Sequence, residues 1–171
     1  MKALLATTTA VAFSVLLAAC GGGDEGVIVE EHDPSPSGQA ASLTVAAATD
    51  ATLNGVYAST NLNLNNVTKV NPIGGDPETC RFKFNGLTQT GGARMMDGDV
   101  RYIPGNPELR TTVVSIATVE FRLLGSAGAA VDRTNNRVNF TGATFTATSG
   151  SGATIMLTGA LPMRPDRPEG C

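Results

Sequence analysis

Aromatic residues are scarce in this chain. It has no tryptophan, two tyrosines and six phenylalanines among its 171 residues. Grooves that bind nucleic-acid bases or proline-rich peptides are usually lined with aromatic side chains, so this composition argues against those ligands. Basic residues are also few, with 12 lysines and arginines against 15 aspartates and glutamates. Because nucleic-acid binding depends on a basic face, we expect no nucleic-acid partner.

Histidine is nearly absent, and this excludes most nucleophilic catalysis. The single histidine, His32, lies in an acidic N-terminal segment, so the rest of the chain has no base for a Ser-His or Cys-His pair. A Ser-Lys pair could use only Lys69 or Lys83, and no motif surrounds either. Two carboxylates a set distance apart are the remaining route to hydrolysis. The candidates are Asp97, Asp99, Glu108 and Glu120. We expect no enzymatic activity and no cofactor.

Metal-ligating side chains are present but poorly arranged. His32 stands among the acidic residues of segment 30–33, where a flexible chain would offer no preorganised geometry. Met95 and Met96 carry thioethers, but adjacent strand residues point to opposite faces, so we expect one in the core and one exposed. Asp97-Gly98-Asp99 suits a turn better than a calcium site, which needs about six to eight oxygen ligands. We therefore expect no metal site.

The N-terminus has the layout of an export signal. Lys2 precedes an uncharged, mostly apolar run that ends in Leu17-Ala18-Ala19-Cys20, as in secretory signal peptides. The last four residues resemble the lipobox of bacterial lipoproteins. This resemblance implies cleavage before Cys20 and lipid attachment to it. Gly21 follows, not the aspartate that retains lipoproteins at the inner membrane of enteric bacteria, so the resemblance favours an outer-membrane anchor facing the periplasm. The alternative is a secreted protein in which Cys20 is incidental.

Two cysteines remain once Cys20 carries lipid, Cys80 and Cys171. In an oxidising periplasm these two have a single intramolecular pairing, and we expect a Cys80–Cys171 disulfide. It would fasten the proline-rich segment 162–170, which cannot join a central strand because proline lacks the backbone N–H. Free or intermolecular thiols are the alternative.

Composition divides the chain into three parts. Residues 1–19 are the expected signal peptide, residues 20–48 the lipidated cysteine with a flexible acidic tether, and residues 49–171 a β-domain. Glycines, prolines and like charges after Cys20 support the tether, since they extend a chain without folding it. Residues 43–48 are apolar, and either an early strand or the end of the tether fits them.

Period-two alternation dominates the rest of the chain. In one such run Cys80, Phe82 and Phe84 share a face, which we expect to be buried. The β-prone run 111–124 changes parity at its middle, so we expect a bulge or a turn near Ala117-Thr118.

Turn signals separate these runs, and no window carries a helical stripe. Gly91-Gly92 and Asp97-Gly98 are both hairpin signals and compete for the same neighbourhood. Roughly eight short strands with turns at regular spacing predict an all-β fold, either an antiparallel β-sandwich or a small β-barrel.

These observations favour a lipid-anchored outer-membrane protein that is not an enzyme and that binds another envelope protein or supports an envelope assembly. Two alternatives stay open. One is a carrier that holds a small apolar ligand inside a lipocalin-like barrel, which requires an internal cavity. The other is a carboxylate-dependent hydrolase of envelope sugars, which requires two of the four candidate carboxylates to converge in a cleft.

Overall fold

The computed structural model describes residues 33–71, 77–150 and 152–171. The signal-like N-terminus, Cys20 and His32 lie outside these residues. Nothing within the described ranges is a helix long and apolar enough to cross a membrane. A 3-10 turn, η1, covers Ala51–Leu53. The strands are β1 (Ser35–Pro36), β2 (Ala41–Ala46), β3 (Gly55–Ser59), β4 (Asn63–Leu64), β5 (Thr68–Val70), β6 (Thr79–Gln89), β7 (Met95–Tyr102), β8 (Leu109–Ile116), β9 (Val119–Leu124), β10 (Ala129–Asp132), β11 (Arg137–Ala147) and β12 (Thr154–Pro162).

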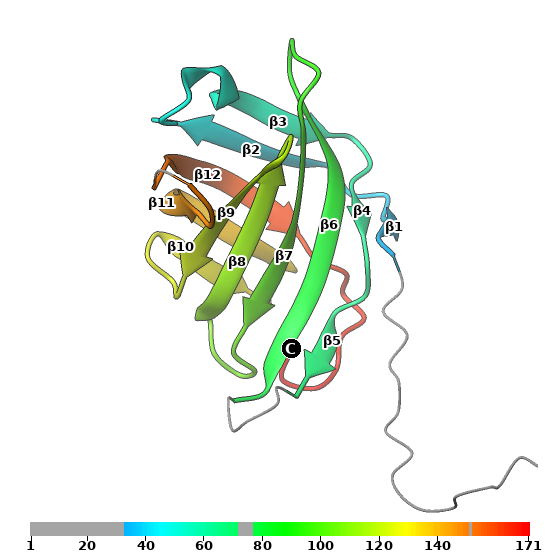
Figure 1. The fold of residues 1–171 in the computed structure, drawn as a ribbon. Helices are drawn as coiled ribbons and strands as arrows, with labels where there is room; N and C mark the ends of the chain where they lie inside the picture. Colours follow the sequence, from blue (N-terminus) through cyan, green and yellow to red (C-terminus); the bar gives the residue numbers. More distant parts are fainter. Residues whose placement is uncertain (1–32, 72–76, 151) are drawn as a thin grey trace, which may run out of the picture. The chain divides into compact units, whose positions relative to one another are not determined.

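Eight of these strands form a closed antiparallel barrel (Figure 1). Around the ring their order is β2, β3, β6, β7, β8, β9, β11 and β12, and β12 pairs with β2 to close it. Strands that follow one another therefore lie side by side, as in up-and-down barrels. β4 and β5 continue the pairing along β6, β1 pairs with β4, and β10 pairs with the start of β11. The residue pattern allows a sandwich or a barrel, and the structure is a barrel.

Alternation along each strand fills the barrel with apolar side chains. In an antiparallel strand successive side chains point to opposite faces, so one set faces inward throughout. The expected buried face of Cys80, Phe82 and Phe84 is confirmed. The bulkiest fully buried side chains are Tyr57, Tyr102, Phe82, Phe84, Phe121 and Phe145. The interior is therefore a packed core.

The barrel begins earlier in the chain than composition indicates. Segment 41–46, which the expected boundary assigned to the tether, forms β2 and pairs with β3 on one side and β12 on the other. Ala41, Leu43 and Val45 are buried, whereas Ser42 and Thr44 between them are exposed. Residues 43–48 fitted either an early strand or the end of the tether, and the structure places 43–46 in β2, with Leu43 and Val45 in the core.

The turns follow the expectations in part. Ala117 and Thr118 connect β8 to β9, and the residues on either side of them are paired, which confirms the turn expected there. Gly91-Gly92 lies in the turn between β6 and β7. Asp97-Gly98 does not form a turn but lies inside β7. A side chain at Gly98 would collide with the ring of Phe84, which packs over it, so this glycine serves packing.

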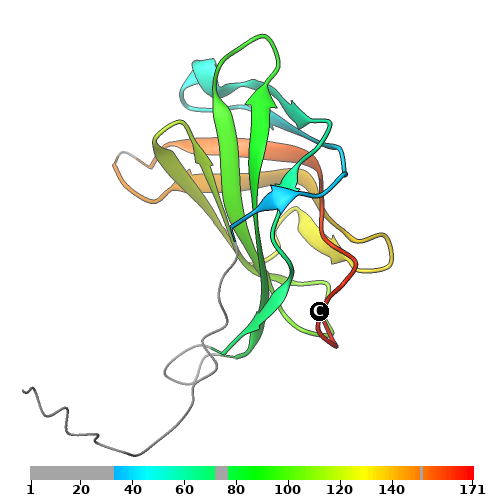
Figure 2. The same ribbon diagram turned by 90° about the vertical axis from the view of Figure 1, so that its right-hand side faces the viewer.

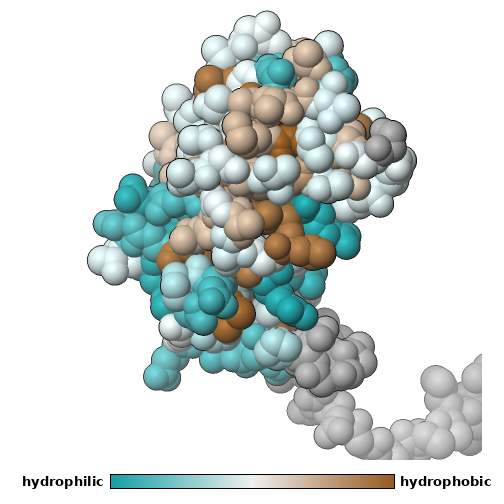
Figure 3. Space-filling view, turned by 90° about the vertical axis from the view of Figure 1, so that its left-hand side faces the viewer, coloured by the Kyte–Doolittle hydropathy of each residue, from teal (hydrophilic) through white to brown (hydrophobic). Residues whose placement is uncertain are grey.

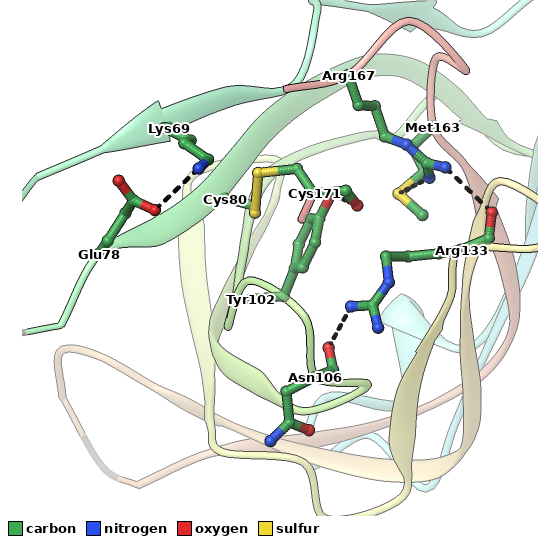
Figure 4. Close-up of a disulfide and its surroundings, with 9 residues drawn as sticks. All are labelled: Lys69, Glu78, Cys80, Tyr102, Asn106, Arg133, Met163, Arg167 and Cys171. Carbon is green, nitrogen blue, oxygen red and sulfur yellow. Dashed lines mark hydrogen bonds and ion pairs between the residues drawn. A yellow bond between two sulfur atoms is a disulfide. The ribbon is translucent and has the colours of Figure 1, made fainter. Parts of the chain in front are cut away.

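The C-terminal tail runs from β12 to the beginning of β6 (Figure 2). The expected disulfide is confirmed, since the sulfur atoms of Cys80 and Cys171 lie 2.03 Å apart. Tyr102 stands beside it (Figure 4), and its hydroxyl donates a hydrogen bond of 2.8 Å to the carbonyl oxygen of Cys171. Burial raises the pKa of Tyr102 to about 12. Disulfide and phenol together hold the tail against the barrel.

Removing the disulfide should destabilise the fold strongly. The bond spans 91 residues, and a loop of that length lowers the entropy of the unfolded chain enough to stabilise the fold by roughly 4 kcal/mol. We expect the double variant Cys80→Ala, Cys171→Ala to lose about that free energy of unfolding in urea titrations. Reduction should lower the stability of the wild type and leave that of the double variant unchanged. Equal stability of the oxidised and reduced wild type would contradict this prediction.

The buried phenol should make stability sensitive to alkaline pH. An ordinary tyrosine ionises near pH 10, and the folded protein holds the proton of Tyr102 to about pH 12. The stabilisation is therefore complete below pH 10 and is lost as pH rises toward 12, by up to about 2 kcal/mol. Tyr102→Phe should be less stable than the wild type at pH 7, by about 1 kcal/mol for the lost hydrogen bond. The difference between the two proteins should shrink above pH 10 and change sign before pH 12, because only the wild type loses stability by ionising this phenol. A difference that stays constant with pH would refute this prediction.

Candidate functional site

An open groove runs over the outer wall of the barrel where β7, β8 and β9 lie side by side. Its volume is about 710 Å³. We call it the arginine groove, and its lining residues are Val70, Pro77, Thr79, Asp99, Arg101, Ile103, Glu108, Leu109, Arg110, Thr111, Val113, Arg122, Leu124 and Gly125. Ligand sites commonly measure about 300–1,000 Å³, so the groove has room for a small ligand or a short peptide segment.

Strand pairing arranges the floor of the groove in two rows. In the first row, Val113 of β8 lies between Asp99 of β7 and Arg122 of β9. The second row consists of Arg101, Thr111 and Leu124. All six residues have the parity that faces away from the barrel. Arg101 and Arg122 occupy opposite corners, with their Cα atoms about 12 Å apart given the usual strand spacing and rise.

A bulge in β8 adds another cation. Tyr102 pairs with Leu109, whereas Arg101 pairs with Thr111, so Arg110 has no opposite residue. Arg110 is exposed and lines the groove. A bulge of this kind turns a side chain to one face of the sheet where a regular ladder would place it on the other face. Without this bulge, Arg110 and Thr111 could not both reach the outer wall.

Asp99 organises the charges at one side of the groove. Its Oδ2 accepts from Nε of Arg81 at 2.7 Å and from the Nη2 of the same guanidinium. Its Oδ1 is buried, accepts no hydrogen bond, and lies 3.5 Å from Nε of Arg101. The Asp99 side chain is 19% exposed, which weakens screening by water and strengthens the pairing with Arg81.

Charged side chains of both signs lie on this wall. The outward positions of β6 to β9 carry Arg81, Lys83, Arg101, Arg110 and Arg122, together with Asp97, Asp99 and Glu120. Arg122 and Glu120 make a long contact of 3.5 Å, with the two side chains 48% and 44% exposed. That pairing is weak. The guanidinium of Arg122 is therefore accessible to solvent over the groove, and most of its N–H groups can donate to a ligand.

Apolar side chains lie among these cations. Leu124 is 74% exposed, and Val113 contributes to the floor. Val70 and Ile103 line the groove at its other side. Arginine combined with exposed apolar surface is typical of protein interfaces. The groove is thus suited to a ligand that carries both negative charge and an apolar group.

The opposite wall has a different character. Thr141, Thr158 and Thr44 form an outward row across β11, β12 and β2. In the space-filling view, residues of intermediate hydropathy cover most of the upper part of the molecule, whereas strongly hydrophilic and strongly hydrophobic residues lie side by side in the middle and lower part (Figure 3). A more open hollow of about 840 Å³ lies near small residues such as Ser42 and Ala58. No charged side chain among the described residues lines this hollow, and it is shallow.

A third hollow lies at one end of the barrel. Its volume is about 260 Å³, it reaches the buried side chains of Ile116 and Phe121, and Asp50 and Arg94 line it. The volume is below the usual range of ligand sites. It leads onto the packed core that fills the barrel.

The four candidate carboxylates do not form one cluster. Asp99 and Glu108 both line the arginine groove, but Asp99 is engaged by Arg81. Asp97 and Glu120 lie on either side of Ser115 in a neighbouring outward row. Catalysis by a carboxylate pair needs both members directed at one bond, whereas Asp99 is paired with Arg81.

The two adjacent methionines lie on opposite faces of β7, as the alternation of side chains along a strand predicts. Met96 is buried and Met95 is 56% exposed, as expected. Lys69 pairs with Glu78 at 3.2 Å. The described ranges hold no group of three or more histidine, cysteine, aspartate or glutamate side chains that could hold a metal ion.

Sequence reasoning did not single out Arg101, Arg110 or Arg122. They are about ten residues apart in the chain, so no motif or charge run joins them. Their common outward parity on three successive strands is the signal that could have found them, since antiparallel neighbours bring such positions together. The arginines also needed the correct register, which depends on the bulge at Arg110.

Comparison with protein-family models, curated proteins and solved structures found no match to this chain.

Asp99 should matter for stability far more than a neighbouring surface carboxylate. Asp99→Asn removes the carboxylate that accepts from the partly buried guanidinium of Arg81, and we expect a loss of about 1–3 kcal/mol in the free energy of unfolding. Glu120→Gln is the matched control, because its pair with Arg122 is solvent-exposed and should contribute less than about 0.5 kcal/mol. Urea titrations of both variants give the comparison. Equal effects would mean that Asp99 does not organise the charges.

Proposed function

We propose that this protein is a non-enzymatic binding module of the bacterial envelope, held at the outer membrane by lipid on Cys20 and facing the periplasm. Its barrel binds another envelope protein, and the arginine groove is the contact surface. The anchor is supported by the Leu17-Ala18-Ala19-Cys20 pattern, and a periplasmic location is in keeping with the Cys80–Cys171 disulfide.

The observation that carries the proposal is the division between a filled interior and a grooved outer wall. Arg101, Arg110 and Arg122 surround exposed apolar surface at Leu124. Arginine is enriched among the residues that contribute most to binding at protein interfaces. A large exposed apolar side chain beside three cations has no role in the core of the barrel, and contact with a partner accounts for it.

The two alternatives have less support. A carrier needs a cavity inside the barrel, and Tyr57, Phe82, Phe84 and Phe145 occupy that space. A hydrolase needs two cooperating carboxylates, and Asp99 is held by Arg81 in an ion pair instead. Neither alternative explains the exposed Leu124.

Photo-crosslinking in intact cells of the source organism tests the proposal. A photoreactive phenylalanine analogue at Leu124 should yield a discrete light-dependent adduct with one envelope protein, because this position lies in the groove. The same analogue at Thr158, on the opposite wall, is the matched control and should yield no such adduct. Adding Arg101→Glu and Arg122→Glu should abolish the adduct by charge repulsion.

The anchor is tested with the same cells. Cys20→Ser should release the protein from the membrane fraction, and the mature wild type should have the mass of an acylated Cys20. Retention of the variant in the membrane would refute the anchor. Identical adducts from Leu124 and Thr158, or none from Leu124, would refute binding through the groove.

A further inference from the structure

The lining of the arginine groove specifies more than a generic interface. Resting on the function proposed above, we propose that the groove binds an extended segment of the partner in which two acidic side chains flank an apolar one at every second position. The motif is acidic–x–apolar–x–acidic. Arg101 and Arg122 would each receive one carboxylate, and the apolar side chain would lie over Val113 and Leu124.

The spacing of the two arginines selects this motif. Their Cα atoms lie about 12 Å apart across three strands. In an extended peptide, alternate side chains share a face, and residues four apart are separated by about 13 Å. Carboxylates at the first and fifth positions therefore match the two corners, and the third side chain falls between them. Carboxylates on adjacent residues would point to opposite sides of the peptide and could not engage both arginines.

Both arginines have capacity for a new partner. The Arg122 side chain is 48% exposed and has only the 3.5 Å contact with Glu120. The Arg101 side chain is 40% exposed, with a 3.5 Å contact to Oδ1 of Asp99. Arg81 makes the closer contact with Asp99, because its Nε donates a hydrogen bond of 2.7 Å to Oδ2, the other oxygen of that carboxylate. A guanidinium forms short, two-pronged bonds with a carboxylate, so a peptide carboxylate would offer each arginine a better contact than it has now.

Acceptors in the same groove favour a peptide over an anionic lipid. Glu108 is exposed beside the cations, and Oδ1 of Asp99 accepts no hydrogen bond. If Arg101 turned toward a partner's carboxylate, Oδ1 of Asp99 would be left for a donor. A peptide backbone supplies N–H donors as well as carbonyl acceptors, whereas an ionised lipid phosphate supplies acceptors alone. The mixed lining therefore fits a peptide.

Fluorescence anisotropy with short synthetic peptides tests this inference. The probe is a labelled heptapeptide with glutamate, valine and glutamate at positions two, four and six, separated by serines. Purified full-length protein should bind it, and raising the salt concentration should weaken binding. A peptide with glutamine in place of both glutamates, and one with the glutamates moved to adjacent positions, should each bind at least about tenfold more weakly.

Variants locate the site. Arg101→Gln with Arg122→Gln should weaken binding of the probe at least about tenfold, and Leu124→Ser by about fivefold. Arg137→Gln is the matched control, because Arg137 is an exposed arginine of β11, outside the groove, that pairs with Asp132. It should leave binding unchanged. These substitutions are on the surface, and circular dichroism confirms that each variant is folded.

The remaining outcomes decide against the inference or against the function separately. Equal binding of the glutamine peptide, or unchanged binding by the double variant, overturns the motif. Loss of binding to phosphatidylglycerol vesicles in the double variant, with no peptide binding by the wild type, assigns the groove to anionic lipid instead. A crosslinked partner at Leu124 without peptide binding leaves the proposed function standing and removes the motif. Peptide binding without any crosslinked partner supports the motif and removes the proposed function.

Discussion

Hydrogen bonding between β12 and β2 is the constraint on which this structure depends. It joins β12, the last strand of the chain, to β2, the first strand of the ring, and so closes a meandering sheet into a barrel. Gly159 permits the contact, because a side chain there would collide with the backbone of Ser42. Closure also decides, for every residue of the eight strands, whether it faces the core or the solvent.

That division gives the inward and outward positions very different compositions. Inward positions are occupied by aromatic and aliphatic side chains that pack together, so little space remains within the ring. Outward positions are free to vary, and they differ from wall to wall: threonine and other small residues over β2, β11 and β12, arginine and aspartate over β7 to β9. An eight-stranded barrel either fills its interior with side chains or holds one small ligand there, and in this barrel aromatic and aliphatic side chains occupy the interior.

Local patterns predict much of this fold, and long-range pairing accounts for what they miss. The inward face of Cys80, Phe82 and Phe84 follows from alternation, and the turn at Ala117-Thr118 from a change of parity. The cysteine pairing follows by elimination once Cys20 is assigned to lipid.

Other features depend on what lies opposite in space. Gly98 reads as a turn residue until Phe84 is seen to pack over it. Residues 43–48 fit either a strand or the end of the tether, and only the pairing of β2 with β3 and β12 decides between the two. The groove needs the register of three strands and one bulge, which no local window contains.

The disulfide also has a mechanical consequence. All strands from β7 to β12 lie between Cys80 and Cys171, inside one covalent ring, whereas β1 to β5 are held by hydrogen bonds and packing alone. Under tension between the N-terminal end and the groove, the early strands would yield first, and the strands that carry the arginines would keep their covalent closure.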